Sequence, residues 1–395
     1  MKLTFVSNYL NHHQIPVSEV LYRKLGADYH FIQTEPMEEE RVQMGWTCDV
    51  EKVPYLLEYY KQEDACRDLI ENSDVVIFGG VEDERYIKSR LNSGKLIIRY
   101  SERIYKEGQW KAVSPRGLIK KYQDHTRYRK KQIYLLCSGA YVASDFHIIH
   151  AYPNKMFKWG YFPEFIPYPK SLETAIKEES EVPEILWAGR MISLKHPQKA
   201  IETADYLVKR GYQFKMTIIG DGVLREALEQ LAIEKNLQKH IDFIGFLSQK
   251  EVREYMERAD IFLFTSDFNE GWGAVANEAM NSGCALVADV AIGAVPYLIE
   301  DGVNGLIYKN GKKDELFRCT EYLLTHKEER EKMGRAAYET IREKWNPQNS
   351  AEKLLDLCYN LLKGQIVFQS DGPCSRADIV SPRKMYRYLK KRTKK

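Results

Sequence analysis

Two loops in the second half of the chain carry side chains that suit a phosphorylated ligand. The first loop holds Arg190 and Lys195, follows the apolar stretch Glu184–Ala188 and precedes a helical pattern. Cations beside the start of a helix favour an anion there, because the free backbone N–H groups and the helix dipole are both positive. Two solvated surface charges are the alternative, since arginine and lysine side chains are most often exposed.

The second loop holds two carboxylates eight residues apart, Glu270 and Glu278. Gly271 and Gly273 permit close backbone approach, and a helix expected to begin near Ala274 offers N–H groups to a diphosphate. The carboxylates would then accept hydrogen bonds from sugar and ribose hydroxyls. Alternatively, they are two acids that the helix dipole favours near the first turn.

Strands that alternate with helices must position these loops, and the pattern predicts parallel α/β layers in both halves. Ligands of open α/β sheets bind beyond the carboxyl ends of the strands. The expected strands are Lys2–Ser7, Val75–Phe78, Lys95–Tyr100, Gly139–Ser144, Glu184–Ala188, Phe214–Ile219, Ile241–Gly245, Ile261–Thr265 and Ala285–Val290. The expected helices are Gln14–Leu25, Tyr55–Asn72, Pro197–Arg210, Val223–Lys235, Gln249–Arg258, Lys327–Glu343 and Pro347–Leu362.

A proline-rich break separates the two halves. Three prolines lie within residues 162–169, which disfavours a helix, and an acidic, lysine-containing linker is expected to follow up to residue 181. The predicted organisation is one domain over residues 1–165, a second over 181–345, a helix over 347–362 and a basic tail over 363–395.

Composition indicates a globular protein, with 44% hydrophobic and 29% charged residues and no apolar run long enough to span a membrane. The seven cysteines are scattered without metal spacing, which predicts reduced thiols in a cytosolic protein. The first residues are expected to form a strand rather than a signal peptide. Net charge is +3, but the final thirteen residues contain eight lysines or arginines, so the body is not expected to bind nucleic acid.

The loops in their order along the chain resemble the donor domain of the retaining family 4 glycosyltransferases, which have the GT-B fold. The matching pieces are Gly189–Met191 with Lys195, Gly220–Gly222, Phe243–Phe246, Glu270 with Glu278, Asn281–Ala288 and Val295–Ile307. This resemblance implies an α/β protein with two Rossmann-like domains that face a central cleft. The first domain would take the acceptor side, the second would bind the nucleotide sugar, and helix 347–362 would cross back to the first.

The resemblance also implies roles for single residues. Arg190 and Lys195 would bind the donor diphosphate and stabilise its growing charge, Glu270 would bind the donor sugar, and Glu278 would bind the ribose. The resemblance also implies donor contacts from Gly189, Gly220, the strand end at Phe246, and backbone groups of Gly271, Trp272, Gly273 and Ala274. For Phe246, packing in the core is the alternative. The chain has no Asp-x-Asp motif, so we expect no metal and no cofactor besides the nucleotide-diphosphate sugar as co-substrate.

The first domain departs from the family pattern. The glycine-rich loop that often follows the first strand is Asn8–Gln14 here, and Ser101–Arg103 replaces a histidine after a central strand. His12, His13 and Glu102 lie at strand ends and are predicted to bind the acceptor, with ordinary structural roles as the alternative. Near the sugar, Gly293 stands alone where many members have two glycines.

Two basic regions that contain tyrosines, residues 120–131 and 383–392, bear on the acceptor. They fit either solvated charged faces or contact with an anionic membrane surface. Lipid-linked acceptors are common among similar enzymes.

Together these features predict a retaining glycosyltransferase that uses a UDP-sugar, with a GDP-sugar as the second choice. It would act on a glycan or lipid-linked acceptor in surface polysaccharide or glycolipid biosynthesis, in the cytoplasm or at the inner face of the cell membrane. A noncatalytic nucleotide-sugar-binding scaffold at a membrane is the alternative. A Rossmann oxidoreductase is disfavoured because no Gly-x-Gly-x-x-Gly follows a predicted strand.

Overall fold

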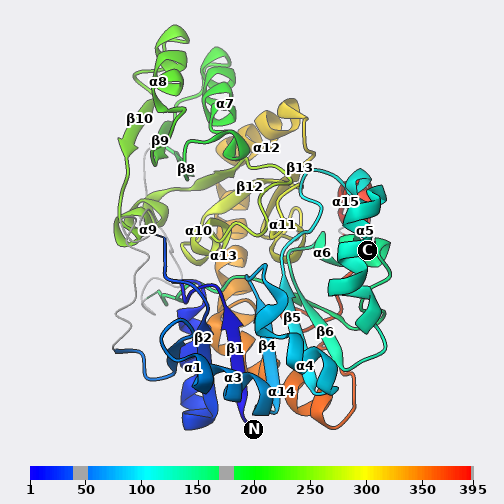
Figure 1. Cartoon of the computed structure of the whole chain (residues 1–395). Coiled ribbons are helices and arrows are strands. Elements are labelled where there is room, and N and C mark those ends of the chain that lie inside the picture. Colours follow the sequence, from blue (N-terminus) through cyan, green and yellow to red (C-terminus); the bar gives the residue numbers. More distant parts are fainter. Residues whose placement is uncertain (39–51, 169–181, 393–395) are drawn as a thin grey trace. The chain divides into compact units, whose positions relative to one another are not determined.

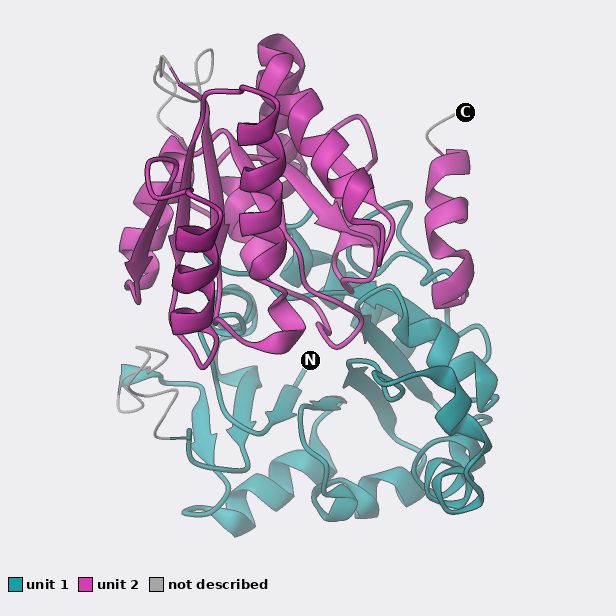
Figure 2. Cartoon of the chain, turned by 90° about the horizontal axis from the view of Figure 1, so that it is seen from above, with its two compact units in different colours: residues 1–164, 344–380 teal, residues 165–343, 381–395 magenta. Residues whose placement is uncertain are grey.

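The computed structural model describes residues 1–38, 52–168 and 182–392. The chain forms two compact units, coloured separately in Figure 2. Unit 1 comprises Met1–Glu164 and Lys344–Val380, and unit 2 comprises Phe165–Glu343 and Ser381–Lys395. Residues 169–181 of the predicted linker lie outside the described residues.

Unit 1 contains a seven-stranded sheet with the strand order β3-β2-β1-β4-β5-β6-β7, and every pairing is parallel. Its helices flank this sheet (Figure 1). The strands are β1 Leu3–Ser7, β2 Tyr29–Gln33, β3 Leu56–Glu58, β4 Val75–Gly79, β5 Leu96–Ser101, β6 Ile133–Ser138 and β7 Met156–Trp159. The helices include α1 Ile15–Leu25, α3 Glu63–Asn72, α4 Lys88–Ser93, α5 Pro115–Asp124, α6 Val142–Ile148 and α14 Pro347–Leu362.

Unit 2 repeats the arrangement with a six-stranded parallel sheet in the order β10-β9-β8-β11-β12-β13. The strands are β8 Glu184–Ala188, β9 Lys215–Ile219, β10 Ile241–Gly245, β11 Ile261–Phe264, β12 Ala285–Asp289 and β13 Gly305–Tyr308. The helices are α7 Gln198–Lys209, α8 Arg225–Glu234, α9 Gln249–Arg258, α10 Val275–Asn281, α11 Val295–Leu298, α12 Lys313–Thr325, α13 Lys327–Glu343 and α15 Pro382–Arg392. The prediction of an α/β protein with two parallel sheets is confirmed.

Central strands are the elements that the sequence predicts best. Residues of β4, β6 and β12 are buried throughout, because helices cover both faces of a doubly wound parallel sheet. Such strands read as short, continuous apolar stretches. The bounds of the central strand β8 agree with the prediction to the residue, and so do those of β10, although β10 lies at the sheet edge and is partly exposed.

Two elements of unit 1 were predicted wrongly. The strand expected over Gly139–Ser144 is a turn that leads into α6, and the actual strand is β6, which ends at Ser138. Gly139 has φ 114°, a conformation that ends the strand and favours glycine. The helix expected over Tyr55–Asn72 begins only at Glu63, because residues before it form β3 and pair with β2 at the sheet edge.

The C-terminal residues divide between the units. Helix α14 packs on α1 of unit 1, where Lys24 pairs with Glu352 at 2.8 Å. The segment after α14 stays with unit 1 through hydrogen bonds such as that from the Ala377 N–H to the Met156 carbonyl. Helix α15 belongs to unit 2, where its Met385 and Leu389 are buried. None of the described helices is long and apolar enough to cross a bilayer.

Helix α13 lies unusually close to the turn between α10 and β12. A Cβ atom on Gly334 would lie 2.2 Å from the Gly283 carbonyl oxygen, which is backbone. We expect Gly334→Ala to lower the free energy of unfolding by about 1–3 kcal/mol, the usual cost of overpacking. Gly117→Ala in α5 is the matched control, because its Cβ would meet only ordinary contacts at 3.5 Å.

Thermal and denaturant unfolding of the two variants would check this. Gly117→Ala should be neutral or stabilising by up to about 1 kcal/mol, since alanine is the better helix former. A Gly334→Ala protein as stable as the parent would contradict the close packing.

Candidate functional site

In both units the strand order reverses at one point of the sheet, next to β1 and β4 in unit 1 and next to β8 and β11 in unit 2. Loops that leave the carboxyl ends of two such strands turn to opposite sides and open a crevice, where α/β proteins bind ligands. In unit 2 these loops are Gly189–Lys195 and Thr265–Ala274. They are the two loops that the sequence analysis selected.

An ion pair joins these two loops. The Lys195 ammonium contacts a carboxylate oxygen of Glu270, and the two side chains are 17% and 14% exposed. The Thr265 hydroxyl donates to the Lys195 carbonyl at 2.7 Å, and the Trp187 indole N–H donates to the Thr265 hydroxyl at 2.9 Å. A cation and a carboxylate predicted to act together therefore lie together, and the Thr265 hydrogen bond holds the Lys195 backbone in place.

Arg190 lies in the same loop as Lys195, but its side chain is exposed. Among the residues that the structure describes, its guanidinium makes no ion pair. The backbone beside it is tightly held. The Gly189 N–H donates to the Ile219 carbonyl at 3.0 Å, and a Cβ on Gly220 would lie 2.0 Å from the Gly189 carbonyl oxygen. Gly220, with φ 128°, thus allows the loops after β8 and β9 to touch through their backbones.

Glycines also shape the loop that carries Glu270. Gly273 has φ 90°, and a Cβ there would lie 2.3 Å from the Phe264 ring. A Cβ on Gly293 would lie 1.7 Å from the Gly271 carbonyl oxygen, so the single glycine of this segment is needed for the approach of two backbones. Ala274 is the N-cap of α10, as predicted from the helix start.

Trp272 is almost fully buried, and its indole N–H donates to Asn277 at 2.9 Å. Its side chain is therefore part of the core, and its backbone carbonyl accepts from the Ala294 N–H at 3.1 Å. Phe246 is different: its side chain is 58% exposed just after β10, so it does not pack in the core.

Glu278 lies in α10 and is half-buried. The Gln249 amide donates to its carboxylate at 3.3 Å. Burial raises the pKa of Glu278 to about 7, although the Gln249 hydrogen bond and the charge of Arg253 oppose this rise. The carboxyl therefore titrates near neutral pH, which is uncommon for an acid outside functional sites.

In unit 1 the predicted acceptor residues form one cluster around Tyr161. The His12 and His13 rings lie 3.7 Å apart after β1, and His13 stacks on Tyr161 with ring centroids 5.3 Å apart. The Tyr161 hydroxyl donates to Glu102 at 2.5 Å, and Lys106 pairs with the same carboxylate at 2.5 Å. Burial and the nearby Glu102 charge raise the pKa of Tyr161 well above its usual value.

Tyr161 connects two sequence segments that are far apart, and the sequence analysis missed it. Its position just before the proline-rich break was the available signal.

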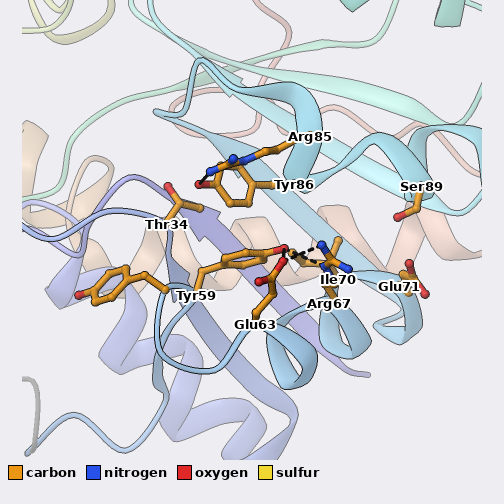
Figure 3. Close-up of a pocket in the computed structure, with 10 residues that line it drawn as sticks. Thr34, Tyr59, Glu63, Arg67, Ile70, Glu71, Arg85, Tyr86 and Ser89 are labelled. Carbon is orange, nitrogen blue, oxygen red and sulfur yellow. Dashed lines mark hydrogen bonds and ion pairs between the residues drawn. The ribbon is translucent and has the colours of Figure 1, made fainter.

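A hollow of about 450 Å³ in unit 1 was also not predicted (Figure 3). The Tyr59 and Tyr86 rings meet edge to face inside it at 4.7 Å. Its two arginines have acidic partners, Arg67 with Glu63 at 2.6 Å and Arg85 with Asp83 at 3.1 Å. The lining residues are Thr34, Tyr59, Tyr60, Glu63, Arg67, Ile70, Glu71, Arg85, Tyr86 and Ser89.

The second half of the chain is similar in sequence to a known protein family. The family described as Glycosyl transferases group 1 matches residues 171–340. Alpha-D-kanosaminyltransferase of Streptomyces kanamyceticus is 31% identical over 155 residues, which are 39% of this chain and 40% of that protein. The amylovoran biosynthesis glycosyltransferase AmsK of Erwinia amylovora is 33% identical over 33% of each chain. The chain thus spans less than half the length of the curated relatives it matches.

Solved structures extend the likeness in fold to most of the chain. HepE of Anabaena, in complex with UDP, has a TM-score of 0.68 at 12% identity and is matched over 91% of this chain and all of that one. WaaG, a glycosyltransferase of lipopolysaccharide biosynthesis, has a TM-score of 0.60 at 16% identity over 90% and 99% of the two chains. The match to the glycosyl transferases group 1 family thus covers residues 171–340, and the two parallel sheets together with the likeness to these structures show the GT-B fold.

Proposed function

We propose that this protein is a retaining glycosyltransferase that transfers a sugar from a nucleotide-diphosphate sugar to a glycan or lipid-linked acceptor. The observation that carries the proposal is the Lys195–Glu270 pair at the reversal of the strand order in unit 2, with Arg190 in the same loop as Lys195. Relatives named for sugar transfer or for polysaccharide biosynthesis support it. A UDP-sugar is the preferred donor and a GDP-sugar the second choice, since HepE and a further similar structure, TarM of S. aureus, were both solved with UDP.

The residues of unit 2 suit the departure of a diphosphate. Breaking the sugar–phosphate bond leaves negative charge on the diphosphate and positive charge on the sugar. The Lys195 ammonium and the exposed Arg190 guanidinium would stabilise the first, in the place of a metal ion. Glu270 would accept hydrogen bonds from the sugar hydroxyls, so a bound donor would separate the two charges that now neutralise each other.

Removing either cation should slow turnover more than it weakens donor binding, because the charge on the leaving group is largest in the transition state. We expect Arg190→Ala and Lys195→Ala each to lower kcat by on the order of 10²–10³-fold. Lys195→Arg should rescue only in part, since a planar guanidinium does not replace a compact ammonium. Glu270→Ala should impair both binding and turnover.

Steady-state kinetics and calorimetric donor binding would measure these effects. Lys209→Ala on the exposed surface of α7 is the control, because the partner of Lys209 among the described residues is Asp205, outside both loops. Near-normal turnover in both Arg190→Ala and Lys195→Ala would show that this loop is ordinary protein surface.

Glu278 gives nucleotide binding a predicted dependence on pH. If its carboxylate accepts hydrogen bonds from the ribose, binding needs the ionised form, and the pKa of about 7 places that change near neutrality. We expect UDP or GDP to bind more weakly at pH 6 than at pH 8, and Glu278→Gln to lose most of this difference. Titration of the nucleotide phosphate affects binding to the parent protein and to Glu278→Gln equally. The difference between the two proteins therefore reports on the Glu278 carboxyl alone.

The raised pKa of Glu278 also predicts how the stability of the folded protein changes with pH. A carboxyl whose folded-state pKa is raised contributes stability below its unfolded pKa and loses that contribution as pH rises through 7. Without nucleotide, Glu278→Gln should therefore gain thermal stability relative to the parent between pH 5 and pH 8. A parallel pH dependence of both proteins would contradict the raised pKa.

We place the glycan acceptor against unit 1, at the cluster of His12, His13, Tyr161 and Glu102. The stacked aromatic rings offer apolar faces, and the carboxylate offers hydrogen-bond acceptors, the two features that bind sugar rings. Glycan names among the relatives support an acceptor of this class.

For an acceptor carried by lipid, we propose that helix α5 meets an anionic membrane surface. No residue of α5 is buried, and large apolar side chains around it are exposed: Trp110 70%, Val113 78%, Leu118 42%, Ile119 60% and Tyr122 58%. Leu118, Ile119 and Tyr122 share one face of the helix. Nine lysines and arginines but only two acids lie in residues 106–131, which suits an interfacial helix.

Helix α15 has less surface to offer a membrane than its composition suggests. Tyr386 donates to Glu315 at 2.8 Å, and Lys390 pairs with Asp301 at 2.5 Å. The apolar residues Met385 and Leu389 are buried within unit 2. Its remaining cations would add attraction but no inserted side chain.

Trp110→Ser, Ile119→Ser and Tyr122→Ser combined should strongly reduce co-sedimentation with phosphatidylglycerol vesicles. Neutralising a single exposed cation of α15 should weaken binding less, by about 1 kcal/mol. Val223→Ser with Ile233→Ser is the control, because these residues are exposed apolar side chains of unit 2. Equal vesicle binding by all these proteins at low salt would exclude the α5 surface.

A further inference from the structure

His196 adopts a backbone conformation that non-glycine residues rarely take. It follows Lys195 directly and has φ 48° and ψ 50°, the left-handed region. A Cβ atom makes this region unfavourable, so a residue other than glycine persists there only when its surroundings hold it. Such residues concentrate at functional sites, and the side chain of His196 shows what holds this one.

Both ring nitrogens of His196 have partners. Nδ1 lies 3.3 Å from the Gln198 amide nitrogen at the start of α7. Nε2 lies 2.9 Å from a carboxylate oxygen of Asp267, in the loop after β11. Because the Gln198 amide donates to Nδ1, the ring proton resides on Nε2 and is donated to Asp267. The imidazole therefore bridges the Lys195 loop and the Glu270 loop.

Asp267 organises the turn that delivers Glu270. Its second carboxylate oxygen accepts from the Asn269 backbone N–H at 2.8 Å. Its carbonyl accepts from the Glu270 N–H at 3.0 Å, and its own N–H donates to the Leu194 carbonyl at 3.1 Å. Displacing Asp267 would thus displace the backbone of Glu270.

We propose that His196 and Asp267 are a positioning pair for the proposed glycosyl transfer, which sets the separation of the Lys195 ammonium and the Glu270 carboxylate. His196 directly follows Lys195, and Asp267 precedes Glu270 by three residues. A donor that draws Lys195 toward its diphosphate and Glu270 toward its sugar removes the ion pair between the loops. The His196–Asp267 hydrogen bond keeps the two backbones in register at that moment. This inference rests on the proposed function.

The variant His196→Gly separates positioning from stability. Glycine adopts the left-handed conformation without strain, and this gain offsets the two hydrogen bonds lost with the imidazole, so thermal stability should change little while the link between the loops is lost. We expect kcat to fall on the order of 10- to 100-fold, as for a slightly misplaced catalytic group, with UDP and GDP affinity little changed. His196→Gln should restore part of kcat, because its amide nitrogen reaches about as far as Nε2.

Asn236→Gly is the matched control. Asn236 is also left-handed, with φ 56°, and it is exposed after α8, away from both loops. This variant should lose the same backbone strain and keep its kcat. If His196→Gly retains the parent kcat, or if both glycine variants lose turnover alike, the positioning role is wrong.

Nitrogen NMR of the histidine ring tests the pair without any sugar donor. In the parent protein, His196 should carry its proton on Nε2, and Asp267→Asn should shift that signal. A proton on Nδ1, or a spectrum unchanged in Asp267→Asn, would overturn the proposal even in an active enzyme. A parent protein with this NMR signature but without transferase activity would instead contradict the proposed function.

Discussion

The candidate site depends on one ion pair between two loops that are far apart in sequence. Lys195 follows β8 and Glu270 follows β11, and these strands are neighbours only because the sheet of unit 2 reverses its order there. Each charge is mostly removed from water, and a half-buried charge without a partner is costly. The pair therefore makes the approach of the loops favourable, and under the proposed function its two charges would bind different parts of a phosphorylated sugar.

Much of the surrounding structure serves this approach. Gly220, Gly273 and Gly293 lie where backbones or rings leave no room for a Cβ atom. The Thr265 hydroxyl accepts from Trp187 and donates to the Lys195 carbonyl, and Asp267 accepts from His196. These hydrogen bonds hold the two loop backbones without involving the charged groups of Lys195 and Glu270. The side chains of Lys195 and Glu270 can therefore change partners while the backbone remains in place.

Features that depend on a few neighbouring residues could be predicted from the sequence, whereas contacts between residues far apart in the chain could not. The continuous apolar stretches of β8 and β10 and the glycine-bounded loop before α10 are visible within a few residues, and they were predicted correctly. Strands β2, β3, β7 and β13 were missed, and edge position alone does not explain this, because the edge strand β10 was predicted and β2 pairs with two neighbours. The His196–Asp267 contact spans 71 residues and the Tyr161–Glu102 contact spans 59, and no local pattern marks either. Phe246 and Trp272 were selected together, yet only Phe246 presents its side chain to solvent.

The position of the diphosphate tests the central claim most directly. Crystals grown with UDP, and separately with GDP, would locate it in the electron density. We predict diphosphate oxygens within hydrogen-bond distance of the Arg190 guanidinium and the Lys195 ammonium, with the ribose hydroxyls on Glu278. A nucleotide bound in the hollow beside Tyr59 and Tyr86, or elsewhere on unit 2 with the Lys195–Glu270 pair untouched, would contradict this assignment of the donor site.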